Sequence, residues 1–477
     1  MRYEINSPFA EIRDRLNQFA PGQQSRVFPD APRGILFPGD PGVAKRILDI
    51  YYNGLMPRIG VAYDPTGSGR MSLRAAYGIF YDSFSNGTGM PMQAAISAIP
   101  FLQAVQLGPP ALNYTNPWGA TGVPFRPGFF PKPVTMLTEN ATGRPPYAQN
   151  WNLSIQRSLP AAMLFEIRYV GMKGTRVPRF VEANPSVYTP ATSSQSVDAR
   201  RIYAGCPAAG GPCDFASVGL VDYSTNSTYH ALQTTLSRRF NRGLTFSTSY
   251  WFSKTLDYVS SMNVAGSAPR LISGENDIAQ NPFDLRAEHG PSLFDAKHRW
   301  TANATWELPF GKTLQGASRT LLAGWQLNGI ATVSSGTPFT VYDTRNVAQQ
   351  GSHPEITGFA GSRPDLIADP NRGSRTVDQW VSRSSFRRLD AVAEAGRFGN
   401  AGRNIARSPN QGALDISAFK NWSLSEHLRA QLRIEAFNVT NHANFGVPVN
   451  DLVSPNFGRI LEAGPPRVFQ AAVKILF

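Results

Sequence analysis

Residues 428–437, LRAQLRIEAF, decide the fold because their side chains alternate between apolar and polar almost without a break. The apolar set is Leu428, Ala430, Leu432, Ile434 and Ala436, and Phe437 alone interrupts the polar set of Arg429, Gln431, Arg433 and Glu435. Successive side chains of a β-strand point to opposite faces of a sheet. The segment therefore predicts a strand with one apolar and one polar face.

The same period of two recurs along the whole chain. Residues 299–308 repeat it with two tryptophans on the apolar face, and residues 73–81 repeat it with tyrosines and aliphatic side chains. We predict about twelve strands, at residues 1–6, 57–65, 70–82, 147–158, 163–171, 226–239, 243–256, 296–308, 324–342, 411–422, 427–438 and 466–477. The pattern predicts an all-β fold.

The connections between these strands alternate strictly in length. The short ones are residues 65–69, 159–162, 240–242, 309–324 and 423–426; the long ones are 7–56, 83–146, 172–225, 257–295, 343–410 and 439–465. Short turns at one rim and long loops at the other are typical of outer-membrane barrels. The sequence therefore predicts an antiparallel up-and-down transmembrane β-barrel with short periplasmic turns and long extracellular loops. A soluble β-rich binding protein is the rival interpretation.

Aromatic side chains fall at the ends of the predicted strands. Trp306, Trp325, Trp422 and Tyr63 lie at the short-turn end, whereas Tyr81 and Tyr169 lie at the long-loop end. This distribution predicts two aromatic girdles at the membrane interfaces.

The last strand ends on an aromatic residue and alternates throughout. Its apolar face holds Phe469, Ala471, Val473, Ile475 and Phe477. We interpret these five residues as the signal read by the barrel-assembly machinery, against the alternative that the apolar ending is chance.

Charged residues on the polar faces are the best candidates for function. They are Arg58, Arg74, Glu166, Arg168, Arg299, Glu307, Arg429, Arg433 and Glu435. Inside a barrel such residues would face the lumen, where they tune passage and hold a plug by salt bridges. They could equally pair across strands, and both roles can hold together.

The bulk composition excludes other classes of function. The net charge is +13, but the basic residues are scattered singly and form no nucleic-acid-binding module, so we expect no nucleic-acid partner. The six histidines form no metal-binding spacing, and neither a G-x-S-x-G elbow nor a P-loop is present. We expect no enzyme activity, no metal and no cofactor. A loose acidic group in one long loop, namely Asp257, Glu275, Asp277, Asp284 and Glu288, could bind a cation or simply be solvated.

Two further observations concern export. Cys206 and Cys213 flank a Gly/Pro-rich run and could form a disulfide in an oxidising compartment or remain two thiols. Neither a signal peptide nor a hydrophobic helix long enough to span a membrane is visible, so we expect the export signal to lie upstream.

Five runs resemble one family in their order and spacing. They are PRIGVAYDPTGSGRMSLRAAYGIFYD at 57–82, NWNLSIQRSLPAAMLFEIRYVGMKGTRV at 150–177, FDAKHRWTANATWELPFGK at 294–312, GWQLNGIATVSSGTPFTV at 324–341 and RAQLRIEAFNVTNHANFG at 429–446. Together they resemble the barrel of TonB-dependent outer-membrane receptors of the Oar-like kind, over nearly the whole chain.

This resemblance implies a barrel of 22 strands with a plug, preceded by a regulatory-like domain and a TonB-contacting segment. Residues 1–477 would then be the C-terminal part of the barrel, without plug or N-terminal domain, and we expect a fragment. The implied function is uptake of a large substrate, with siderophore, oligosaccharide and peptide all open. The alternative is a structural or adhesive surface barrel. The implied partners are outer-membrane lipid, the barrel-assembly machinery, the TonB complex and an unknown substrate.

Overall fold

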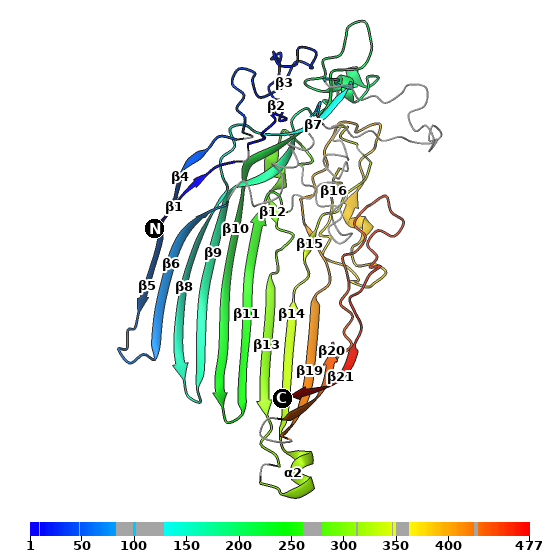
Figure 1. Cartoon of the computed structure of the whole chain (residues 1–477). Coiled ribbons are helices and arrows are strands. Elements are labelled where there is room, and N and C mark those ends of the chain that lie inside the picture. The colour runs from blue at the N-terminus through cyan, green and yellow to red at the C-terminus, as the bar shows by residue number, and fades with distance from the viewer. Residues whose placement is uncertain are drawn as a thin grey trace.

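The computed structural model describes residues 1–8, 10–46, 48–82, 99–101, 128–260, 279–311, 313–345, 347–349, 362–423 and 428–477. A single large antiparallel sheet dominates it (Figure 1). Its main path runs through β5 (Arg58–Tyr63), β6 (Met71–Tyr81), β8 (Tyr147–Leu159), β9 (Met163–Glu182), β10 (Phe215–Asn241), β11 (Leu244–Asp257), β13 (His298–Glu307), β14 (Trp325–Ser334), β19 (Gln411–Ser423), β20 (Arg429–Phe437) and β21 (Val468–Leu476). Each strand pairs with its neighbour along the chain, as an up-and-down meander requires.

Shorter elements surround this path. Two strands join the sheet at its upper end: β12 (Gly290–Pro291) pairs with β11, and β7 (Val134–Glu139) pairs in parallel with β10. Four two-stranded sheets pair β1 (Arg2–Asn6) with β4 (Tyr51–Met56), β2 (Gln18–Phe19) with β3 (Ile35–Leu36), β15 (Pro338–Phe339) with β18 (Ala406–Arg407), and β16 (Asp365–Leu366) with β17 (Phe386–Arg387). Helix α2 (Gly316–Leu322) lies between β13 and β14, and 3-10 helices span Pro190–Thr192, Asp198–Arg200, Leu285–Glu288 and Arg383–Ser385.

Eleven of the twelve predicted strands lie in the large sheet, which confirms the predicted antiparallel β fold. The segment 1–6 is a strand, but it pairs with β4 outside that sheet, and residues 51–56 were wrongly assigned to a loop. The β4 sequence YYNGLM does not alternate. At Gly54 the backbone of β4 lies very close to the backbone of β1. A Cβ at that position would lie 2.2 Å from the carbonyl oxygen of Glu4.

Three predicted boundaries were also wrong. Residues 172–182 extend β9 and residues 215–225 extend β10, although both segments were predicted to be loop. Residues 324–342 were predicted as one strand, but β14 ends at Ser334. Gly336 follows at a point where the chain passes so close to the backbone of Ser408 that a Cβ would not fit.

The register separates the two faces of the sheet. Arg74, Ser154, Arg168, Gln233, Trp251 and Arg299 are consecutive partners across six strands and form one mostly polar row. The adjacent row on the other face runs through Ala75, Leu153, Tyr169, Leu232, Phe252 and His298. Its large apolar side chains are exposed rather than packed against a second layer, as expected for a surface that contacts lipid.

The buried hydrophobic clusters lie away from the apolar face of the sheet. One joins residues 31–37 with residues 130–136, Phe215 and Val218. The other joins Phe339 and Val341 with residues 381–406, Leu452 and Phe457. Long loops supply most of both clusters, so these loops form packed bodies at one end of the sheet (Figure 1). Within the described part of the chain, no helix combines the length and hydrophobicity needed to cross a membrane.

Candidate functional site

A recess of about 550 Å³ opens on the polar face over β5, β6, β8 and β9. Small residues such as Gly60, Ala62 and Ala76 form its floor and leave room above the strands. Arg74 and Arg168 line it, and both belong to the polar row in which Ser154 stands between them. The recess therefore presents two guanidinium groups at a surface that is otherwise small and uncharged.

The structure brings the nine charged candidates onto one face. Arg58 stacks on the ring of Phe80 at 4.5 Å, and Arg299 stacks on Trp251 at 5.5 Å. Glu307 and Arg433 lie in one row, separated by Gln326 and Phe419. Glu435 lies opposite Ser417, and Arg429 lies opposite Ser423.

Ion pairing among these nine residues, all of them described, runs along a strand. Arg168 donates to the carboxylate of Glu166, two residues away on β9, at 2.5 and 2.9 Å. Arg74 donates to the hydroxyl of Ser72 at 3.1 Å. Arg74 and Arg168 are thus each contacted by a neighbour on their own strand, whereas Arg299 is contacted by Trp251 of the adjacent strand β11.

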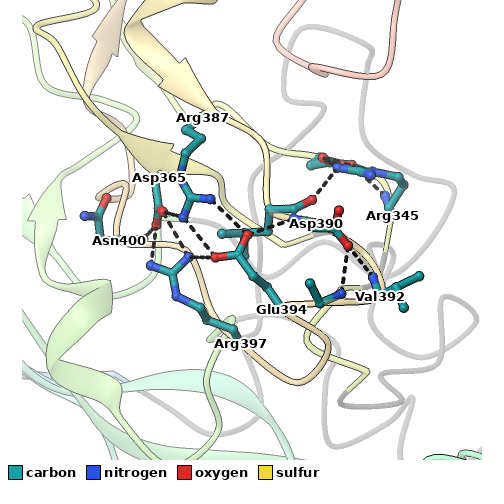
Figure 2. A network of polar contacts seen from close by, with 11 residues as sticks. Arg345, Asp365, Arg387, Asp390, Val392, Glu394, Arg397 and Asn400 are labelled. Carbon is teal, nitrogen blue, oxygen red and sulfur yellow. Dashed lines mark hydrogen bonds and ion pairs between the residues drawn. The ribbon is translucent and has the colours of Figure 1, made fainter.

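The loop between β14 and β19 carries a second concentration of charge (Figure 2). Arg387 and Arg397 both contact the carboxylate of Asp365, the latter at 2.9 and 3.1 Å, and the backbone N–H of Asn400 donates to it as well. Glu394 accepts from Arg387 at 2.9 and 3.0 Å and from Arg397 at 3.0 Å. Each carboxylate is shared by two guanidinium groups, which crosslinks β16, β17 and the turn at residues 390–397.

The same contacts set the protonation of these carboxyls. Burial alone would raise the pKa of Asp365, but hydrogen bonds from Arg397 and Arg387 outweigh it and the pKa is lowered. Hydrogen bonds from Arg387, followed by the backbone N–H of Asp390, lower the pKa of Glu394 to about 2. Both groups are therefore ionised at neutral pH.

Three further arginines tie this loop to the loop between β11 and β13. Arg363 contacts Glu288, Arg403 contacts Asp257, and Arg407 contacts Asp295. Sequence reasoning missed these pairs. The many arginines in residues 363–407 and the acidic residues in 257–295 indicate that the two segments attract each other, but not which residues pair.

Those acidic residues of the candidate cation site that the structure describes bind arginines or backbone N–H groups. Asp257 and Glu288 are bound by arginines, and Asp284 accepts from the backbone N–H of Arg286 at the start of a 3-10 helix. Glu275 and Asp277 lie outside the described residues. Within the described ranges, no three His, Cys, Asp or Glu side chains are placed to hold a metal ion.

The remaining sequence candidates lie at two other places. Cys206 and Cys213 are joined by a disulfide in the loop between β9 and β10. Phe469, Ala471, Val473 and Ile475 share the apolar face of β21, with Phe477 directly after the strand. Their side chains are exposed. Thus the five residues form a free apolar stripe at an edge of the sheet.

The two-faced antiparallel meander, with packed loops at one end only, defines a transmembrane β-barrel protein. The sequence profile of the outer membrane beta barrel domain matches residues 1–470, and the chain belongs to that family. Its place is accordingly the bacterial outer membrane. No curated protein matches the chain.

Solved structures with a similar arrangement include three outer-membrane proteins. The outer membrane transporter YddB from Escherichia coli is 7% identical, with a TM-score of 0.43, over 90% of this chain and 40% of that one. The FrpB iron transporter from Neisseria meningitidis is 12% identical, with a TM-score of 0.39, over 90% and 39%. The ferripyoverdine receptor of the outer membrane of Pseudomonas aeruginosa is 11% identical, with a TM-score of 0.36, over 90% and 34%. The chain thus spans two fifths or less of each of these proteins.

Proposed function

We propose that the chain is the barrel portion of a TonB-dependent outer-membrane receptor that takes up a large substrate. The observation that carries this proposal is the continuous polar face, which crosses the strands beneath loops that are packed into folded bodies. A wall that only anchors a protein in lipid needs an apolar outer face, but it does not need arginines on the other face. Charged residues on the inner wall of a barrel tune which solutes pass through it.

In this proposal the polar face lines the barrel interior and the apolar face meets lipid. Arg74, Arg168 and Arg299 then follow one another around the wall in a single row. Such a row attracts anionic groups of a substrate or acidic side chains of a plug. The substrate class is left open between siderophore, oligosaccharide and peptide.

The proposal also treats residues 1–477 as part of a larger barrel. Among the described strands, β5 and β21 form the two ends of the sheet path and do not pair with each other. Unpaired backbone N–H and C=O groups at such edges are costly in hydrocarbon. We therefore propose that further strands close the barrel, with a plug and a TonB-contacting segment belonging to the same protein. The apolar stripe of β21 would be read by the barrel-assembly machinery.

Gene replacement in the source bacterium tests the proposal. Cells lacking the coding region are compared with the parent for growth on ferric chelates, oligosaccharides and peptides, each as the limiting nutrient. Transport predicts loss of growth on one class, and the same loss when the TonB gene is deleted. The Arg74→Gln, Arg168→Gln double variant should lower uptake of that nutrient, whereas Arg157→Gln, on the apolar face, should not.

The opposite outcome would favour the structural or adhesive alternative. In that case growth on every nutrient class would be unchanged by the deletion, and attachment of the cells to surfaces or to one another would fall. Uptake that persists without TonB would also contradict the proposal.

A further inference from the structure

Helix α2 protrudes at the short-turn rim, below the ends of β13 and β14 (Figure 1). None of its residues is buried in the protein; Leu321 is 66% exposed and Leu322 is 54% exposed. A helix of seven residues is too short to persist alone in water, where about 12 residues or more are needed. Something other than intrahelical bonding must therefore hold it.

A cap at the C-terminal end of α2 provides part of its stabilisation. The last carbonyl groups of a helix have no intrahelical partner. Here the indole N–H of Trp422 donates to the oxygen of Thr320 at 3.1 Å, and that of Trp325 donates to Leu321 at 2.9 Å. The ammonium group of Lys420 donates to the oxygen of Ala323. Three side chains of the sheet thus supply the missing donors.

All three donors come from the apolar face of the sheet. Lys420 lies opposite Trp325 on β14 and opposite Leu432 on β20, in the position where the alternation calls for an apolar residue. It is only 2% exposed, and its ammonium group lies 5.5 Å from the ring of Trp422. The end of α2 therefore covers a lysine on the lipid-contacting side of the wall, and the helix sits on the outer side of the rim.

The uncovered side of the helix is apolar. Ala317 and Leu321 are four residues apart and share one side of the helix, and the partly exposed Leu314 lies just before its first turn. Phe310, 61% exposed, extends this surface toward Trp306 at the end of β13, with ring centroids 6.5 Å apart. The surface is continuous with the apolar face of the strands.

We propose that α2 is an interfacial membrane anchor, whose Leu321 side chain, together with the adjoining Leu314 and Phe310, inserts into the acyl chains of the leaflet at the short-turn rim. Amphipathic helices of this kind lie in the plane of the interface with their apolar side in the acyl boundary. The helix surface is continuous with the lipid-contacting face, and none of the described residues covers it, so we assign lipid as its occupant. The anchor is independent of transport and goes beyond the proposed function.

The test uses the protein purified from outer membranes as the cell makes it, with Leu321→Cys labelled by bimane. The native cysteines are in a disulfide and do not compete for the label. The protein is reconstituted in vesicles of phosphatidylethanolamine and phosphatidylglycerol, with or without bromine on the acyl chains. We expect brominated chains to quench the label about twofold, and aqueous iodide to have little effect. Arg319→Cys, on the opposite side of the helix, should show the reverse.

Two results would overturn the anchor. One is equal quenching of positions 321 and 319 by iodide, which would place the whole helix in water. The other is protection of position 321 from both quenchers, which would indicate a second copy of the chain or another protein. Phe310→Cys provides an independent position if the first variant does not assemble, and the same outcomes apply to it.

Discussion

The guanidinium of Arg363 donates to the carboxylate of Glu288 at 2.6 and 2.8 Å, and both side chains are fully buried. The two residues are 75 positions apart and belong to the loops that follow β14 and β11. Gln280 reinforces the junction, because its side chain contacts the backbone of both Arg363 and Gly399. The long loops at this rim are thereby fixed to each other rather than left solvated.

Removing one partner of this pair should loosen the loops but not the barrel. Arg363→Met leaves the Glu288 carboxylate buried without its counter-charge, which typically costs about 3–5 kcal/mol. Hydrogen exchange should show that the free energy of opening of the two loops falls by that amount, while protection of β11 and β14 is unchanged. Arg372→Met removes a pair of exposed side chains and should cost under about 1 kcal/mol. Equal effects of the two variants would contradict the structural role.

The charged network around Glu394 should open in acid. Its pKa is about 2, below the ordinary 4.5, so its contribution to stability is complete above pH 4.5. That contribution is lost as the pH falls from 4.5 toward 2. Hydrogen exchange of residues 386–400, corrected for the intrinsic effect of pH, should accelerate over this window. Glu394→Gln should flatten the response, and a variant that still shows the full response would rule out this carboxyl as its source.

Glu139 predicts the opposite dependence on pH. Its carboxyl lies at the end of β7, where it accepts from the hydroxyl of Tyr223 at 3.3 Å, and burial raises its pKa to about 7. The unfolded segment loses its proton near 4.5 and the folded one near 7, so the stability of β7 declines as the pH rises between these values. The loss is on the order of 3 kcal/mol.

Glu139→Gln should remove this decline. Protection of β7 against hydrogen exchange should match the unmodified protein at pH 4.5 and exceed it at pH 8. The neighbouring segment of β10 pairs with β7 and should follow it. Unchanged exchange at pH 8 would mean that the carboxyl is not buried as described.

The strands could be predicted from the sequence because a sheet with two different environments imposes a period of two on every strand. The pairing of Ser154 with Arg168 follows from that alternation together with the short turn at 159–162, whereas the pairing of Arg74 with Ser154 joins strands separated by the long loop 83–146. The extensions of β9 and β10 lie beyond the rim, where both environments are aqueous or packed loop. Pro178 and Gly174 can therefore interrupt the alternation there.

The loop bodies could not be predicted because an ion pair such as Arg363 with Glu288 leaves no periodic trace in either segment. Its partners come together only when two separate loops fold. Lys420 differs, because it breaks the apolar alternation of β19 between Ala418 and Trp422. A charged residue at a lipid-facing position is expensive unless it is covered. That mismatch indicates that the Lys420 side chain needs a partner, although it does not identify α2 as that partner.

Replacement of Lys420 should release α2 while leaving the wall intact. In Lys420→Met the oxygen of Ala323 loses its donor, and the last turn of the helix keeps only the two indole contacts. One lost charge-assisted hydrogen bond is worth about 1.5–3 kcal/mol, so amide exchange in residues 317–323 should rise by about tenfold or more. The strands β14 and β19 should keep their protection, because methionine suits an apolar face. Lys474→Met, an exposed lysine on β21, is the matched control and should leave α2 unchanged. If both variants left the exchange of α2 as it was, Lys420 would not be what holds the helix against the barrel.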